Sequence, residues 1–227
     1  MPIPGAAESP GAMCATRDGG WICCYAPYNT FDPKTVVDRS QIVFMRSDDR
    51  GKSWSSNAMM RFDEVDSGGA EAWVIELADG RLLGTCWHLD LKDEQEYENA
   101  YALSSDGGKS WSPTLSTGIR GQSTGLAALP DGRALFVYNQ RKHGDPGVRL
   151  AVCNPSTSGF GVEHDQLVWN AQVRTQSETS GDHSEWHDFS FGEPCVVQAE
   201  DGTLVVVFWC LQPEVRGIGF VRLEMRD

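Results

Sequence analysis

The chain has 227 residues and a formal net charge of -13 at pH 7, and this length suffices for one substantial hydrophobic core. The acidic excess disfavours binding to nucleic acid or to an anionic membrane surface, because both would repel the chain before any local contact formed. The sequence has no apolar run of about 18 residues, the length of a membrane-spanning helix. Its first residues lack the basic start and apolar stretch of a signal peptide, so we expect a cytoplasmic protein.

Seven cysteines are present, an odd number. Most of them lie in apolar stretches such as WICCYAP and EPCVV, without the C-x-x-C or Cys/His spacing of a metal site. We therefore expect buried free thiols and neither a metal nor a cofactor, with a disulfide or a metal site as the alternative.

An Asp-Gly dipeptide recurs four times between two apolar segments. This pattern predicts β-hairpins, because a tight primed turn needs a positive φ that glycine accepts without a Cβ clash. A further strand-like segment follows each hairpin: SQIVFMRS, ENAYALSS, GVRLAVCN and GIGFVRLEM. The four hairpins are ATRDGGWICCYAP (15–27), ELADGRLLGTCWH (76–88), ALPDGRALFVYNQ (128–140) and QAEDGTLVVVFWC (198–210).

Two similar octets, SDDRGKSW (47–54) and SSDGGKSW (104–111), follow the first two of these further strands. Their Asp and Ser can bond to turn amides, their Gly can take a strained dihedral, and their Trp can pack beneath the turn. We expect an architectural turn that leads to a fourth strand. Four antiparallel strands repeated every ~40 to 60 residues are typical of a β-propeller. The expected blades of this single domain, 1–227, are 8–60, 68–116, 121–170 and 187–227.

The octets resemble the Asp boxes, also called BNR repeats, of sialidase-like β-propellers. The stretches VIELADGRLL and GIGFVRLEM resemble that superfamily too, and the likeness runs from about residue 8 to the end. It implies an all-β propeller of six blades, four of which are recognisable here. The chain would then be a fragment, or its ring would close by oligomerisation.

Glu71 and Glu193 stand at matching places, each eight residues before the Asp of its hairpin turn. In a propeller, this alignment directs both side chains toward the central channel. Two carboxylates that converge on a pocket are what glycoside hydrolysis requires. Alternatively, each glutamate caps backbone amides or pairs with an arginine.

The family resemblance implies roles for this pair. GGAEAWVIELADGRLL resembles the sialidase segment whose Glu activates the nucleophile, and Glu71 matches that Glu. FGEPCVVQAEDGTLVVVFW resembles the segment of the Tyr nucleophile, where this chain has Glu193. A glutamate there would repel the carboxylate of sialic acid. Trp87 or His88 replaces one arginine of the sialic-acid triad, whereas Arg149 matches another, so a different sugar is implied.

Other residues of the same face are candidates for holding a sugar. An aromatic ring can stack on a sugar face, and the basic stretch QRKHGDPGVR (140–149) can bind a uronate, sulfate or carboxylate unless it is an ordinary solvated loop. The stretch DHSEWHDF (182–189) places histidines and acidic residues before Glu193, and these can serve as acid/base groups, metal ligands or ordinary surface residues. The substrate-binding candidates are Trp87, His88, Tyr138, Arg141, Arg149 and His187.

The sequence thus predicts a carbohydrate-active, sialidase-like propeller, a glycoside hydrolase that uses Glu71 and Glu193. The alternatives are a non-catalytic propeller that binds a glycan or a protein, and an inactive fragment of a larger enzyme. The expected partner is a carbohydrate or glycan, with no nucleic acid and no membrane, and an oligomer would form if the propeller is incomplete.

Overall fold

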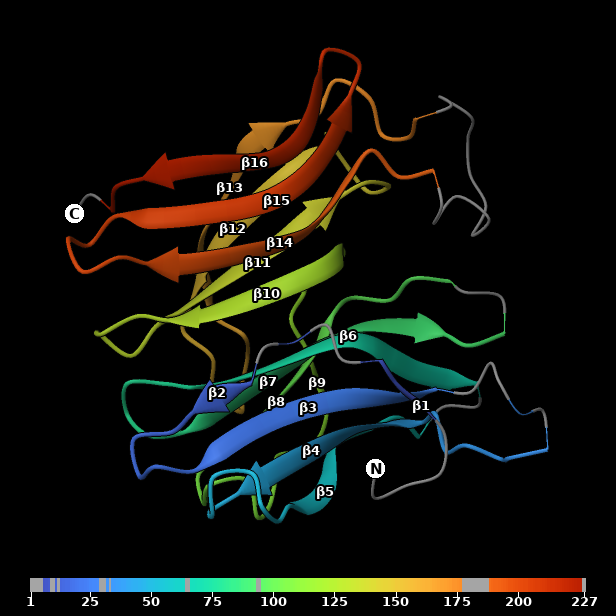
Figure 1. The fold of residues 1–227 in the computed structure, drawn as a ribbon, viewed down its shortest axis with the longest axis vertical. Coiled ribbons are helices and arrows are strands. Elements are labelled where there is room, and N and C mark those ends of the chain that lie inside the picture. Colours follow the sequence, from blue (N-terminus) through green and yellow to red (C-terminus); the bar gives the residue numbers. More distant parts are fainter. Residues whose placement is uncertain are drawn as a thin grey trace.

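The computed structural model describes residues 6–8, 11, 13–28, 32, 34–63, 66–92, 95–176 and 188–225. All regular structure within these ranges is β-strand, and no helix occurs among them. The strands form four antiparallel sheets, arranged as successive blades of a β-propeller along the long axis of the molecule (Figure 1). The predicted all-β propeller fold is therefore confirmed.

Each blade follows the chain from its inner strand outward. In blade 1, β1 and β2 both pair with β3 and share the place of the first strand. The strands of blade 1 are β1 (Ala6–Glu8), β2 (Cys14–Ala15), β3 (Trp21–Tyr28), β4 (Gln41–Ser47) and β5 (Ser55–Arg61). Blade 2 has β6 (Ser67–Glu76), β7 (Leu82–Asp90), β8 (Ala100–Ser104) and β9 (Leu115–Ser116). Blade 3 has β10 (Gln122–Ala128), β11 (Ala134–Gln140), β12 (Gly147–Cys153) and β13 (Val162–Asn170). Blade 4 has β14 (Phe191–Gln198), β15 (Leu204–Gln212) and β16 (Val215–Leu223).

The four Asp-Gly sequences form the predicted hairpins, but with a different turn. In blade 2, Gly80 N donates to Leu77 O at 3.0 Å and Leu77 N donates to Arg81 O at 2.8 Å. Gly80 has a φ of 88°, whereas Asp79 is not among the residues with positive φ. The loop is thus a three-residue turn with a left-handed glycine, and the expected two-residue primed turn was wrong. The Asp79 carboxylate accepts a hydrogen bond from the Arg81 amide at 3.0 Å. This bond stabilises the turn with Asp79 outside the positive-φ region.

Both octets form the same hydrogen-bonded turn between the third and fourth strands of their blades. The Asp106 carboxylate accepts from Ser110 N at 2.9 Å and from the Ser104 hydroxyl at 2.8 Å. Asp49 accepts the equivalent bonds in the first octet. Hydrogen bonds, above all from the Ser110 hydroxyl, lower the pKa of Asp106 to about 2. These carboxylates serve the turn, at the blade end opposite the start of the first strand.

Hydrophobic cores lie between consecutive blades, because side chains alternate between the two faces of each strand. In β11, Phe136 belongs to the core shared with blade 2, and Val137 belongs to the core shared with blade 4. A third core joins blades 1 and 2. The face of blade 4 that points away from blade 3 is open: on β16, Ile218 is 71% exposed and Phe220 is 67% exposed.

The first strands β6, β10 and β14 lie side by side along one face of the stack (Figure 1). Gly125 of β10 stands where β14 comes near. A Cβ atom at Gly125 would lie 2.7 Å from the carbonyl oxygen of Pro194. Glycine is therefore required for β14 to approach β10 this closely.

The cysteines form no disulfide, and Cys24, Cys86, Cys153 and Cys210 are buried as expected. Cys195 is exposed, so the expectation of a buried thiol was wrong there. It lies on β14, whose burial pattern alternates, and its side chain falls on the exposed face of the strand. Among the described residues, no group of His, Cys, Asp and Glu could hold a metal ion, and no helix could span a membrane.

Candidate functional site

Glu71 and Glu193 stand at matching β-bulges near the start of β6 and β14. The pairing register shifts between Ala70 and Trp73 in β6, and between Gly192 and Cys195 in β14. Glu71 has a φ of 50° and Glu193 a φ of 41°. A left-handed backbone is uncommon for a residue with a Cβ, and such strain is concentrated at functional sites. A bulge re-aims its side chain away from the regular alternation of the strand.

The Arg141 side chain follows β11 directly, and only 5% of the residue is exposed. Its Nε and Nη2 both donate to the carbonyl oxygen of Phe191, with an Nε distance of 3.2 Å. Its Nη1 donates to Gln122 Oε1 at 3.5 Å. The guanidinium also lies over the ring of Phe189, 3.9 Å from its centre. Arg141 therefore belongs to the floor of the site, and its head group is not open to solvent.

Three carboxylates act electrostatically on the charge of Arg141. Burial lowers the pKa of Arg141 to about 10, and the negative charges of Glu71, Glu193 and Glu96 oppose this shift. The guanidinium remains protonated at neutral pH. It is thus a fixed positive charge within electrostatic range of both bulge glutamates.

Glu96 is a third buried carboxylate, and the sequence reasoning missed it. It is 6% exposed. Its oxygens lie 3.1 Å from Lys142 Nζ and 2.7 Å from His143 Nε2, and Gln122 Nε2 donates to it. Glu96 lies in the loop after β7, and its two basic partners lie in the corresponding loop after β11. The opposite charges of these corresponding loops are the signal that could have revealed the contact.

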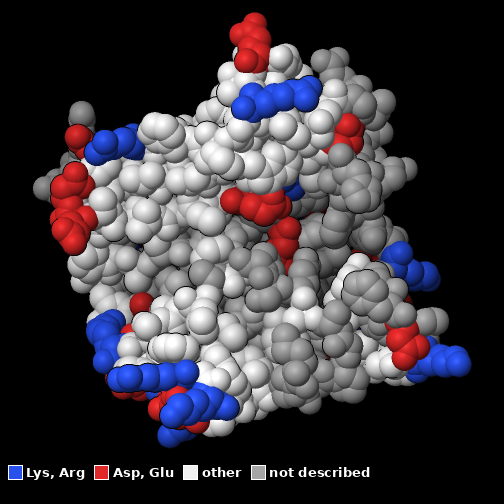
Figure 2. Space-filling model, in the orientation of Figure 1, with Lys and Arg blue, Asp and Glu red and all other residues white. Residues whose placement is uncertain are grey.

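Glu193 lies at the exposed end of the site. The indole Nε1 of Trp209, on β15, donates to Glu193 Oε2. Trp209 is paired with Gly192 across the β14–β15 ladder, so the bulge places the carboxylate beside the indole. Figure 2 shows acidic side chains in the middle of the face lined by the first strands, whereas most visible basic side chains lie at its periphery.

Trp87 is close to Glu71 in the sheet, because it pairs with Ala70. Its residue is only 2% exposed, and it packs with Ala70 and Leu89 in a small core. A ring so buried offers no free face to a sugar. The structure therefore gives Trp87 a packing position and not that of the expected stacking platform.

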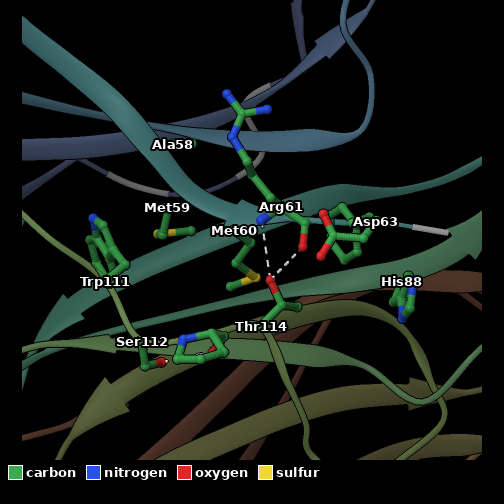
Figure 3. A pocket seen from close by; sticks show the side chains of 11 residues that line it. Ala58, Met59, Met60, Arg61, Asp63, His88, Trp111, Ser112 and Thr114 are labelled. Carbon is green, nitrogen blue, oxygen red and sulfur yellow. Dashed lines mark hydrogen bonds between the residues drawn. The ribbon is translucent and has the colours of Figure 1, made fainter.

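His88 points into a separate cavity of about 460 Å³ between blades 1 and 2. Its ring stacks on Phe62 with centroids 4.7 Å apart, and its Nε2 lies 2.7 Å from the hydroxyl of Ser67. Figure 3 shows His88 at one end of this cavity and Trp111 toward the other. His88 is thus placed away from the carboxylate pair by the alternation of β7.

Tyr138 and Arg149 form a third arrangement with Asp165. The Tyr138 hydroxyl donates to Asp165 Oδ2 at 2.7 Å, and Arg149 Nε lies 3.0 Å from both Asp165 Oδ1 and the Tyr138 oxygen. Burial, followed by the Asp165 charge and hydrogen bond, raises the pKa of Tyr138. Tyr138 belongs to the core between blades 2 and 3. This network is thus built on β11, β12 and the outer strand β13 and uses neither Arg141 nor the bulge glutamates. The remaining candidate, His187, lies outside the described residues.

The family model of the BNR repeat-like domain matches residues 5–161. The chain belongs to this family. A search of curated proteins gives no match. The BNR repeat-like assignment agrees with the successive antiparallel blades and with their repeated hairpins.

Solved structures similar to this BNR repeat-like chain include a protein of unknown function from Dyadobacter fermentans, with a TM-score of 0.71 and 23% identity. That match covers 97% of this chain and 54% of the other. The leech intramolecular trans-sialidase has a TM-score of 0.60 at 16% identity, with 94% of this chain and 31% of the other covered. The GH43_1 enzyme from Xanthomonas citri, complexed with xylotriose, has a TM-score of 0.57 at 11% identity, with 98% and 73% covered. At these identities the likeness shows a shared sialidase-like propeller fold, and the chain spans about half of the first of these proteins.

Proposed function

We propose that this chain forms the sugar-binding face of a glycoside hydrolase that acts on a sugar other than sialic acid. Glu71 and Glu193 are its carboxylate pair. The observation that carries the proposal is their placement at matching, left-handed bulges on inner strands, where the charge of Arg141 acts on both carboxyl groups. A likeness in fold to sialidases and to GH43 enzymes is compatible with this chemistry.

The two carboxyl groups have different surroundings, and we assign their roles accordingly. Glu193 is exposed and accepts the Trp209 N–H, which suits a carboxylate that attacks the anomeric carbon or orients a water molecule. Glu71 is half-buried, which suits the group that donates a proton to the glycosidic oxygen as its bond to the anomeric carbon breaks. Addition of water completes hydrolysis. The positive charge of Arg141 stabilises the ionised form of both groups.

A panel of chromogenic aryl glycosides tests the proposal, with the wild type, Glu71→Gln and Glu193→Gln. We expect turnover by the wild type and a loss of at least about 100-fold in each variant, because removal of a general acid or base costs roughly 10² to 10⁴ in rate. Glu200→Gln, at an exposed hairpin position, is the matched control and should keep full activity. If wild type turns over a substrate and both bulge variants retain that rate, the carboxylate assignment is wrong.

A second candidate is a glycan-binding propeller without catalysis. The electrostatic interaction of both glutamates with Arg141 favours it, because balancing this buried charge would also give the carboxylates a purely structural role. The same panel separates the two functions. A binding propeller would bind sugars measurably and hydrolyse none of them, and Glu71→Gln would lower its stability.

A further inference from the structure

We propose that this site selects an uncharged sugar and disfavours uronic and sialic acids. The inference deepens the proposed function and rests on it. It concerns the charge of the ring that lies against Glu71 and Glu193. The structural reason lies in how the basic groups of the site are used.

The acidic groups in the described part of the site at least balance its permanently charged basic groups. Glu193 and Glu96 alone match the two cations Arg141 and Lys142, and Glu71 adds a third carboxyl group, which is neutral while it holds the proton that it donates. An arriving carboxylate therefore meets no net attraction from these groups, and the chain as a whole adds repulsion through its formal charge of -13.

The basic groups are also occupied. Arg141 is 5% exposed, directs three of its nitrogens at Phe191 O and Gln122 Oε1, and has one ring face against Phe189. Lys142 and His143 both contact Glu96. To grip an anionic sugar, these cations would have to leave buried partners, and a buried carboxylate left without its cation is costly.

The groups that do face a ligand suit hydroxyl groups. An ionised carboxylate only accepts hydrogen bonds, whereas each sugar hydroxyl can donate one. The exposed Glu193 carboxylate can therefore accept a sugar hydroxyl, but it would repel a sugar carboxylate at the same place. The Trp209 N–H, a donor that an anion could otherwise use, is already directed at Glu193. The chemistry of this face thus fits a neutral pyranose or furanose ring.

Matched pairs of neutral and acidic sugars test the inference. The probes are the methyl glycosides of glucose and glucuronate, the methyl glycosides of galactose and galacturonate, xylotriose, and the methyl glycoside of sialic acid. Binding is measured by titration calorimetry or ligand-observed NMR at pH 7, in 20 mM and in 500 mM salt. We expect at least one neutral probe to bind about tenfold or more tightly than its acidic partner in low salt, and the ratio to shrink in high salt, where charge repulsion is screened.

Two variants make the test specific. Glu193→Gln removes one carboxylate without changing the shape of the side chain, so it should reduce the neutral-over-acidic ratio several-fold. Glu200→Gln removes an exposed charge at a hairpin and should leave the ratio unchanged. An acidic probe that binds as tightly as its neutral partner overturns the inference. So does a ratio that is the same in the wild type and in Glu193→Gln.

Failure of the inference differs from failure of the proposed function. If acidic probes bind best and Glu71→Gln abolishes their hydrolysis, the site is a glycosidase with the opposite charge preference. If no probe of either kind binds and no aryl glycoside is hydrolysed, both proposals are wrong.

Discussion

Replacement of Arg141 by Met should lower the free energy of unfolding by about 3–5 kcal/mol, the usual cost of removing one member of a buried charged network. The side chain is 5% exposed. The substitution removes the donors to the Phe191 carbonyl, a loss that alone costs about 1–3 kcal/mol for a buried acceptor. It also leaves Glu71, Glu193 and Glu96 without the cation that they share. Methionine fills much of the volume, so the loss is mainly electrostatic.

Urea denaturation at pH 7, followed by tryptophan fluorescence, measures this effect. Arg141→Lys keeps the charge but loses the planar fork, so its loss should fall between the wild type and Arg141→Met. Arg133→Met is the surface control: its pairs with Asp131 and Glu163 are partly exposed, and it should cost no more than about 1 kcal/mol. An Arg141→Met protein within about 0.5 kcal/mol of the wild type would refute the account of a buried cation that holds the carboxylates.

Further predictions concern other parts of the fold. The pKa of Asp106 is lowered to about 2 in the folded protein, from an unfolded value near 3.9. The ionised Asp106 therefore stabilises the fold above the unfolded value, and this stabilisation is lost as pH falls toward 2. Thermal melts between pH 2 and pH 6 should show a smaller acid-dependent decrease in melting temperature for Asp106→Asn than for the wild type. Phe136→Ala in a core should cost about 3–5 kcal/mol by urea denaturation, whereas Phe220→Ala on the open face should stay within about 0.5 kcal/mol of the wild type. Tyr138→Phe should lose about 1–2 kcal/mol of stability with its bond to Asp165, while kcat and KM on any glycoside that is turned over stay unchanged; a raised KM would instead assign Tyr138 to substrate binding.

The repeated parts of this fold are the parts that its sequence predicts well. Every blade has an Asp-Gly turn after its first strand. Positions the same number of residues before that turn therefore lie at the same height along the first strand of each blade. That count paired Glu71 with Glu193 without any sequence motif, and the bulges show that their backbones match as well. Alternation of apolar residues likewise predicts which side chains fill the cores.

Contacts that depend on a bulge or on a neighbouring blade could not be predicted in this way. The bulge at Glu71 interrupts the alternation of inward and outward side chains in β6. The burial of Trp87, which pairs with Ala70 beside the bulge, could therefore not be predicted from residue spacing. Arg149 lies beside a bulge in the facing strand β13, where Val168 is the extra residue, and its partner Asp165 lies on that outer strand. The Glu96–His143 contact joins loops of different blades, and only their opposite charges pointed to it.

Gly125 has a consequence for the stereochemistry of the proposed reaction. Glycosidases whose carboxyl groups lie about 5–5.5 Å apart retain the anomeric configuration, and those with about 6.5–9.5 Å invert it. Glu71 and Glu193 lie on β6 and β14, with β10 between them, and Gly125 allows the main chain of β14 to lie against β10. The separation of the two carboxyl groups, and with it the anomeric configuration of the product of the proposed reaction, therefore depends on how closely β14 lies against β10, and Gly125→Ala, by moving β14 outward, would widen that separation.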